Sequence, residues 1–422
     1  MSSTRRSSRK PNPRHAQAEC SSANPLKTPL VATIAALVLI LLIAGVVYAA
    51  ISHFATSGEG AGAINATTDL AAPPISAEEQ RVSFVAVGDN LPDAGIGAYA
   101  DARAGETGDG VYDYTSLYSP IAPYIQAADL AYMKQETHIG GDDIGPRGWP
   151  SFNTTDAMAD AVVATGFDLV ASATNHSYDW GSYGAVEHSR KIWAQQTVVF
   201  TGTAASEEQA QIIATIERNG IVFSLLDYTY GVNGFNQTDL APYLVNFIDE
   251  DRIRADVTRA HEVSDVVLVA MHWGTENQTN PDDSQLHYAQ LLADLEVAVV
   301  LGSHPHVIGP LTWVEGSTGH KTLVAYSLGN FLSNHEYPEP LNELEGMLSC
   351  DFVKAGEEVS IENIVWTPLV NHTDQDVRGV YAVKDYTPEL AAKHLYLTSL
   401  EDPIVWLRDT SKHVVGDFMV DG

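Results

Sequence analysis

The sequence predicts an α/β fold built on a largely parallel and buried β-sheet, with a membrane-spanning helix ahead of it. Three observations lead to this prediction. Short apolar runs alternate with helix-like segments from about residue 81 onward, which is typical of strands joined by helices. Of the 422 residues, 45% are hydrophobic and 18% charged, as in folded proteins rather than disordered acidic chains. One uninterrupted apolar stretch near the N-terminus is long enough to cross a bilayer.

Residues 1–29 form a basic segment, with six cations against the single acidic residue Glu19 and a balance of +5. The whole chain has 54 Asp and Glu against 23 Lys and Arg and a net charge of −31, so residues 30–422 carry −36. A chain this acidic is not expected to bind nucleic acid through phosphate contacts, and we predict no nucleic-acid partner.

Residues 30–51 contain no charged side chain and read LVATIAALVLILLIAGVVYAAI. At 1.5 Å per residue they make roughly 30 Å of helix, the thickness of a bilayer's hydrocarbon core. A cleavable signal peptide is less favoured, because its apolar region is usually ~7–15 residues long. The cations precede this stretch and no Lys or Arg follows until Arg81, which places the N-terminus in the cytoplasm. We expect a single-pass signal anchor at the cell membrane, with 1–29 as a cytoplasmic tail and the main domain extracytoplasmic.

Residues 52–80 are rich in Ala, Gly, Ser and Pro and lack periodicity, so we expect a flexible linker. Asn175 begins an Asn-His-Ser triplet that a eukaryotic secretory pathway could glycosylate, although it lies in a motif assigned a function below. An exported bacterial protein is therefore the simpler interpretation.

The folded domain is expected over residues 81–400, followed by a C-terminal tail at 401–422. Apolar runs predict strands at 82–89, 128–133, 167–174, 221–228, 265–273, 297–304 and 322–331. Helix-like segments fall at 156–166, 185–196, 251–263 and 283–295. Residues 346–369 predict two further strands about a Gly-containing turn, which complete a sheet of the same domain.

Metal-capable side chains follow several of these strands. They are Asp89, Glu136, Asn175, His272, His304 and His306. In open α/β sheets ligands bind outside the carboxyl ends of the strands, where these residues would gather. Each has a simpler explanation when taken alone, such as a turn cap for Asp89 or a hydrogen-bonded core histidine for His272. Together they predict a site for one or two divalent ions, Mn, Fe or Zn by ligand type, around a bridging carboxylate.

Six segments in this order resemble the motifs of CapA-type capsule and poly-γ-glutamate synthesis proteins, of the calcineurin-like metallophosphoesterase superfamily. They are GD at 88–89, ADLAYMKQET at 128–137, GFDLVASATNHSYDWGSYG at 166–184, HWGTE at 272–276, LGSHPHV at 301–307 and YSLGNF at 326–331. The resemblance covers about residues 81–335. It implies a metallophosphoesterase-like four-layer sandwich of two mixed β-sheets flanked by helices.

The resemblance also implies roles for individual residues. It places Asp89, Glu136, Asn175, His272, His304 and His306 at metal-ligand positions. His176 falls on the position of the catalytic histidine, with Asp179 able to orient it. Lys134 and Asn330, in two of the same motifs, are the candidate substrate-binding residues. Leu91 stands where the wider superfamily carries a further histidine ligand.

Three functions follow as hypotheses. The first is a metal-dependent hydrolase acting in capsule or poly-γ-glutamate-type surface polymer biosynthesis, in which Glu136 bridges the ions and His176 donates a proton. The alternative is a non-catalytic accessory protein for assembly, export or attachment of an anionic surface polymer, which Leu91 and the cationic Lys134 favour. The partners implied are the cytoplasmic membrane and the polymer or its synthesis machinery. A nucleotidase would add an aromatic clamp, with Trp149, Tyr183, Trp273 and Phe331 as candidates.

Overall fold

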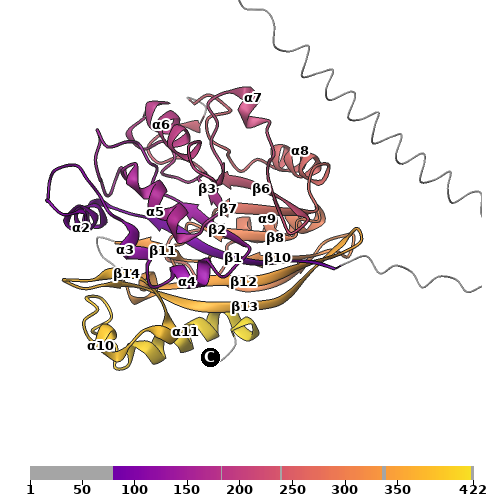
Figure 1. Ribbon diagram of the computed structural model, residues 1–422. Coiled ribbons are helices and arrows are strands. Elements are labelled where there is room, and N and C mark those ends of the chain that lie inside the picture. Colours follow the sequence, from indigo (N-terminus) through magenta and orange to yellow (C-terminus); the bar gives the residue numbers. More distant parts are fainter. Residues whose placement is uncertain (1–78, 182, 238–239, 335–338, 420–422) are drawn as a thin grey trace, which may run out of the picture. The chain divides into compact units, whose positions relative to one another are not determined.

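The computed structural model describes residues 79–181, 183–237, 240–334 and 339–419, in which two mixed β-sheets pack against each other with helices outside them (Figure 1). The predicted two-sheet α/β architecture is therefore confirmed. The predicted anchor at 30–51 lies outside the described residues, as does nearly all of the linker. None of the described helices has the length and apolar character that a membrane crossing requires.

The first sheet has eight strands in the order β14-β13-β12-β1-β2-β3-β4, with β11 also paired to β1. β1 pairs in parallel with β2 and β11 and antiparallel with β12, which makes the sheet mixed. Its strands are β1 (Gln80–Leu91), β2 (Leu130–Gln135), β3 (Leu169–Ala171), β4 (Val199–Thr201), β11 (Asn330–Ser333), β12 (Leu344–Ala355), β13 (Glu358–Thr373) and β14 (Arg378–Ala382).

The second sheet has six strands in the order β5-β6-β7-β8-β10-β9. The four central strands run in parallel, and the two edge strands are antiparallel to their neighbours. Its strands are β5 (Ala214–Arg218), β6 (Ile221–Thr229), β7 (Val266–His272), β8 (Val299–Ser303), β9 (Leu311–Glu315) and β10 (Lys321–Ala325).

Alternating side chains of the strands explain why the sheets are buried on both faces. In β1, Val82, Phe84 and Ala86 lie in a core cluster shared with the six-stranded sheet. Val85 and Val87, on the opposite face, pack into a second core beneath helices. Because strand side chains alternate with a period of two, a strand buried on both faces must be apolar at nearly every position.

Helices cover the outer faces of both sheets. They are α2 (Ala94–Ala104), α3 (Thr115–Tyr118), α4 (Ala122–Ile125), α5 (Ala157–Thr165), α6 (Tyr183–Trp193), α7 (Glu207–Ala210), α8 (Glu250–His261), α9 (Asp283–Asp294), α10 (Pro388–Ala391) and α11 (Pro403–Val415). α9 starts at a capping box, in which Asp282 and Gln285 each bond the other's backbone N–H. Ile253 and Val257 of α8 and Leu292 of α9 pack on the outer face of the six-stranded sheet.

One predicted strand is wrong in its extent. The segment 322–331 is not a single strand, because β10 ends at Ala325 in one sheet and β11 begins at Asn330 in the other. The chain crosses between the sheets over 326–329 and turns at Gly329, whose φ of 75° is the left-handed region that glycine adopts without strain. The crossing brings Asn330 beside Asp89 in the register of β11 and β1.

The C-terminal segment 401–422 is not a tail where it is described. α11 lies along β13 (Figure 1), and Leu407 and Val415 are buried in the core that the two sheets share. The indole N–H of Trp366 in β13 donates to Ser411 Oγ at 3.0 Å. The apolar spacing along this helix therefore covers a sheet face that would otherwise be exposed.

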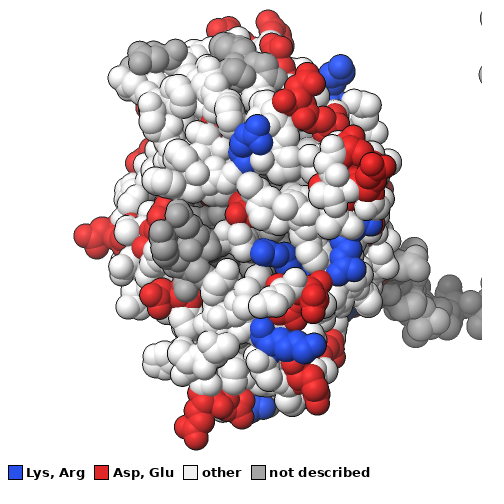
Figure 2. Space-filling model, turned by 90° about the vertical axis from the view of Figure 1, so that its left-hand side faces the viewer, with Lys and Arg blue, Asp and Glu red and all other residues white. Residues whose placement is uncertain are grey.

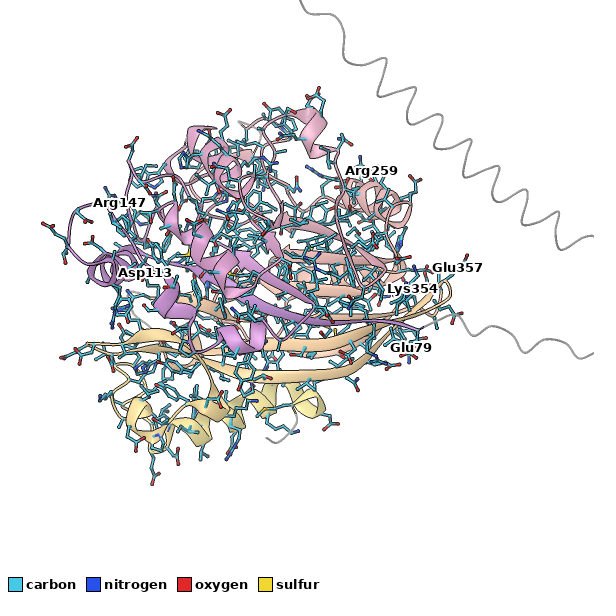
Figure 3. The ribbon with its side chains drawn as sticks, viewed as in Figure 1. Glu79, Asp113, Arg147, Arg259, Lys354 and Glu357 are labelled. Carbon is cyan, nitrogen blue, oxygen red and sulfur yellow. The ribbon has the colours of Figure 1, made fainter. Side chains whose placement is uncertain are left out.

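Charged side chains are scattered over the surface of the domain. On the face that Figure 2 shows, the described Lys and Arg side chains are scattered among Asp and Glu and make no continuous basic patch. Lys354 and Glu357 lie at the β12–β13 hairpin, at the other end of the domain from Arg147 (Figure 3). Lys354 Nζ is 2.6 Å from Asp265 Oδ1, which ties the hairpin to the loop before β7.

Candidate metal centre

The carboxyl ends of parallel strands from both sheets meet at one place, and the predicted metal-capable residues lie there. The residues are Asp89 at a register shift in β1, Glu136 after β2, Asn175 after β3, His272 at the end of β7, and His304 and His306 after β8. All six are buried. The expectation that strand ends would gather these side chains is met by the geometry.

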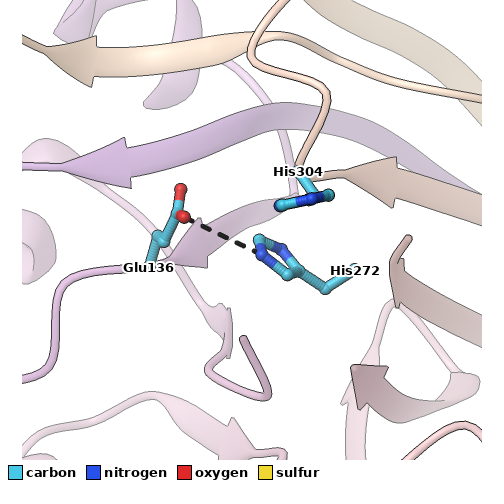
Figure 4. A group of neighbouring side chains, drawn as sticks. All are labelled: Glu136, His272 and His304. Carbon is cyan, nitrogen blue, oxygen red and sulfur yellow. Dashed lines mark ion pairs between the residues drawn. The ribbon is translucent and has the colours of Figure 1, made fainter. Parts of the chain in front are cut away.

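The first group of donors consists of Glu136, His272 and His304, with one ligand atom of each within 4.8 Å of the others (Figure 4). His272 Nε2 is 3.8 Å from Glu136 Oε1 and 2.8 Å from Asn175 Oδ1. His272 Nδ1 lies 2.9 Å from Ser303 Oγ. Imidazole and carboxylate donors at this spacing suit a first-row divalent ion.

The second group consists of Asp89, Glu136 and His306, again within 4.8 Å of one another. His306 Nδ1 is 3.9 Å from Glu136 Oε2, whereas Oε1 faces His272 in the first group. Glu136 thus belongs to both groups and presents a different oxygen to each. A carboxylate placed in this way can bridge two ions.

Several buried polar atoms of these residues have no hydrogen-bond partner among the described residues. They are Asp89 Oδ1, both carboxylate oxygens of Glu136, Asn175 Nδ2 and His304 Nδ1. An unpartnered buried polar group costs about 1–3 kcal/mol, and more when it is charged. A cation among these atoms would remove that cost, so the residues present fit a metal.

Burial shifts the pKa values of these groups toward their neutral forms. It raises the pKa of Asp89 to about 7, against the lowering effect of the His304 backbone N–H. Burial, followed by the charge of Asp89, raises the pKa of Glu136 well above its usual range. Burial lowers the pKa of His304 to about 4 and that of His272 well below its usual range. Neutral imidazoles are ready ligands, and a divalent ion would reverse the shifts of the carboxyl groups.

The backbone around the site is closely packed and partly strained. A Cβ on Gly88 would lie 1.9 Å from the carbonyl oxygen of Gly329, so the residue before Asp89 must be glycine. His304 and His306 have φ values of 93° and 57°, which non-glycine residues rarely adopt. The His304 backbone N–H donates to Asp89 Oδ2 at 2.8 Å, which supports this conformation. Strain of this kind is typical of functional sites.

His176 and Asp179 form a hydrogen-bonded pair at the edge of the centre. His176 Nδ1 is 2.8 Å from Asp179 Oδ2, which also accepts from the backbone N–H of Phe152 at 2.6 Å. His176 Nε2 is 3.4 Å from Asn233 Nδ2. The Asp179 carboxylate therefore orients the His176 ring by its Nδ1 side.

Lys134 does not have the position expected of a substrate-binding residue. Its side chain is fully buried, and Nζ lies 2.5 Å from Asp227 Oδ1 and 2.7 Å from the carbonyl oxygen of Ala173. Asp227, in β6, supplies the countercharge that the sequence analysis did not identify. The substrate-binding prediction for Lys134 is therefore wrong, because its ammonium group serves an internal ion pair.

Asn330 is also buried rather than placed to receive substrate. Its Oδ1 is 2.9 Å from His306 Nδ1, and its Nδ2 donates to the carbonyl oxygens of His306 and Asn342 at 3.3 and 3.2 Å. We correct its role from substrate binding to positioning of His306. Such partners fix the orientation of a ligating imidazole.

Sequence reasoning missed two residues at the mouth of the centre, Tyr230 and Glu276. The ring of Tyr230, which follows β6, lies 4.7 Å from that of His304, and burial with the charges of Glu276 and Glu136 raises its pKa to about 12. The rule of strand carboxyl ends could have found Tyr230, and the HWGTE motif already contained Glu276. Of the aromatic residues considered for a nucleotide clamp, Trp273 and Phe331 belong to the core.

A comparison with protein families gives this geometry a context. The sequence model of the family described as bacterial capsule synthesis protein PGA_cap matches residues 83–335, which include every residue of both donor groups. The chain belongs to this family.

Relatives of this PGA_cap protein have been described in two bacilli. The chain is 29% identical over 168 residues to the PGA biosynthesis protein CapA of Bacillus subtilis, covering 39% of this chain and 42% of that protein. It is 23% identical over 286 residues to the capsule biosynthesis protein CapA of Bacillus anthracis, covering 63% of each. The matches thus span less than two thirds of the length of either relative.

Solved structures with a similar chain path include a phosphoesterase and a phosphatase. A calcineurin-like phosphoesterase from Bacillus subtilis has a TM-score of 0.41 at 10% identity and covers 78% of this chain and 99% of that chain. A phosphatase from Mycoplasma pneumoniae has a TM-score of 0.42 at 12% identity and covers 74% and 96%.

Proposed function

We propose that this chain is a membrane-anchored, extracytoplasmic, metal-dependent hydrolase that acts in capsule or poly-γ-glutamate-type surface polymer biosynthesis. The observation that carries the proposal is the set of buried, unpartnered atoms of Asp89, Glu136 and His304. They converge in two donor groups that share Glu136. Such a set has no structural use in a core, whereas it meets the needs of one or two divalent cations.

A divalent ion in such a site supplies Lewis-acid activation of a phosphoryl oxygen and a lowered pKa for water. The remaining steps belong to the protein. Glu136 presents one carboxylate oxygen to each donor group, and Asn330 fixes the orientation of the His306 ring. Asp179 engages Nδ1 of His176, so Nε2 is the atom that carries a proton to the leaving group.

The substrate class and location rest on the family and on the sequence. The printed names of the two relatives concern PGA and capsule biosynthesis, and we extend that role to this chain. A phosphoester on the polymer or on its precursor is the substrate that the donor set suits best. The apolar stretch at 30–51, with its preceding cations, would hold the domain at the outer face of the cytoplasmic membrane, next to the synthesis machinery.

A non-catalytic accessory role is the second candidate. Leu91 supports it, because this buried side chain stands where the superfamily that the motifs resemble carries a histidine ligand. The same centre would then use its cations to bridge the acidic domain to an anionic polymer, since like charges otherwise repel.

The test is metal content and hydrolysis of the full-length chain. Wild-type protein should bind Mn²⁺ or Zn²⁺ and cleave a chromogenic phosphodiester, whereas His272→Ala and His304→Ala should lose both properties. His413→Ala, an exposed substitution of the same kind on α11, is the matched control. A folded protein without metal, or equal activity in all four proteins, would overturn the hydrolase proposal. Metal binding without hydrolysis of any phosphoester would favour the accessory role.

A further inference from the structure

A third group of donors lies outside the two groups used so far. It consists of Glu276, His304 and His306, with one ligand atom of each within 4.8 Å of the others. Glu276 is exposed, whereas Asp89 and Glu136 are fully buried. The outer group therefore lies between the solvent and the two inner groups. It shares one imidazole with each of them.

The loop that carries Glu276 is fixed against the loop that carries the histidines. The backbone N–H of Asn277 donates to the carbonyl oxygen of Pro305 at 2.8 Å. Asn342 Nδ2 bonds both Asn277 Oδ1 and the carbonyl oxygen of His306, at 2.9 and 3.2 Å. Asn277 has a φ of 61°, a conformation that asparagine tolerates at turns. The backbone next to Glu276 is thus held against the loop of the two histidines by contacts at Pro305 and His306.

Glu276 lies beside the inner site, because two of the three residues of its group, His304 and His306, also belong to the inner groups. His304 Nδ1 is buried without a hydrogen-bond partner among the described residues, which independently indicates a missing ligand on this ring.

The outer and inner groups cannot all be filled at once. His304 belongs to the outer group and to the first inner group, and His306 to the outer group and to the second. An imidazole ordinarily ligates one ion, so each shared ring serves either the outer group or an inner one. An ion in the outer group must therefore leave it when the inner groups fill.

We infer that Glu276 is the metal-capture ligand of this protein, which binds an incoming divalent cation at the exposed edge with His304 and His306 and passes it to the buried carboxylates. The inference rests on the proposed metal centre and adds the route by which it is loaded. A fixed, exposed negative charge at the entrance raises the local cation concentration and the rate of association. The fully buried Glu136 and Asp89 could not make the first contact themselves.

The test follows loading rather than catalysis. Metal-free full-length protein is mixed with Co²⁺ in a stopped-flow instrument, and the visible absorption of bound Co²⁺ is recorded. We expect Glu276→Gln to slow association by about tenfold or more, the lower end of known steering effects, with unchanged Co²⁺ content at saturation. Glu357→Gln removes the same charge at the far hairpin and is the matched control, with an unchanged rate (Figure 3).

Three results would overturn the inference. One is a loading rate for Glu276→Gln within twofold of wild type, and another is an equal slowing in Glu357→Gln. The third is a lower Co²⁺ content at saturation in Glu276→Gln, which would make Glu276 a permanent ligand. Hydrolysis by loaded wild-type protein is measured separately. Its absence would overturn the proposed activity, while the Co²⁺ traces would still decide the role of Glu276.

Discussion

Glu136 shows how much of the centre depends on one side chain. Its two oxygens face His272 and His306, which come from different strands of the six-stranded sheet, while Glu136 itself follows a strand of the eight-stranded sheet. The carboxylate therefore lies between the two sheets at their carboxyl edge, without a hydrogen bond to the described residues of either. Without a cation its burial favours the protonated form, so metal binding and proton release are coupled at this residue.

His176 and Asp179 give a prediction about proton transfer. His176→Asn should lower kcat for a chromogenic phosphodiester by about 10²–10⁴-fold, because it removes the proton donor while leaving both donor groups intact. Asp179→Asn should cause a smaller loss, since the ring stays but is less well oriented. Metal content by mass spectrometry should be unchanged in both variants. A loss of metal in His176→Asn would instead make this residue a ligand.

Glu343 gives a prediction about pH. It is buried near Asn371 and His394, and burial raises its pKa to about 8, whereas an unfolded glutamate titrates near ~4.3. Between these two values the folded state binds a proton that the unfolded state has released, so the free energy of unfolding falls as pH rises. Relative to Glu343→Gln, wild type should lose stability from about pH 4 to about pH 8 and change little above it.

The measurement is urea unfolding of both proteins over that pH range. Comparing the pair removes the contributions of the other titrating groups, which both proteins share. Exposed Glu357→Gln serves as a control that should follow wild type. If the difference in the free energy of unfolding between wild type and Glu343→Gln stays constant over this pH range, the carboxyl group does not titrate as described.

At the scale of elements, an ion pair links the two sheets next to the metal centre. Lys134 lies in β2 and Asp227 in β6, and Asp227 Oδ2 also accepts from the backbone N–H groups of Ser172 and Ala173, each at 2.6 Å. The pair thus holds the end of β3, from which Asn175 and His176 follow. This position explains how the ammonium group of Lys134 can lie close to the metal centre: it faces Asp227 and not the metal-capable residues.

Lys134→Met should lower the free energy of unfolding by about 3–5 kcal/mol, because Asp227 would remain buried without its countercharge. The double variant Lys134→Met, Asp227→Asn should recover a substantial part, since the amide oxygen still accepts the two backbone N–H groups. Guanidinium unfolding of the three proteins measures both effects. Equal stability of Lys134→Met and wild type would contradict the importance of the pair.

The strands also show where the hydrophobic pattern of the sequence predicts secondary structure correctly and where it does not. β1, β6, β7 and β8 were predicted closely because strands buried on both faces are continuous apolar runs. The apolar run at 322–331 gave a wrong prediction of a single strand for the same reason, because a segment that crosses between two sheets is buried like a strand. Short strands such as β4 and β5 were missed because three to five residues carry little pattern.

For the molecule as a whole, the described residues from Glu79 to Met419 belong to one compact unit. A chain starting at residue 76 should therefore fold and remain in the soluble fraction after cell lysis, whereas the full chain should sediment with membranes. Fractionation checks the location, and circular dichroism with thermal unfolding checks the fold of the truncated protein. A full chain found in the soluble fraction would contradict the proposed anchor.

The amino-acid sequence alone established the fold class, the family motifs and the strand ends at which the donors gather. It could do so because parallel strands bring their carboxyl ends to one edge, so that order along the chain implies proximity in space. The three-dimensional arrangement was needed to show that Glu136 faces two donor groups, that Lys134 pairs with Asp227, and that Asn330 holds His306. These contacts join side chains far apart in the chain across two sheets, and the orientation of a side chain is set by packing that no local pattern records.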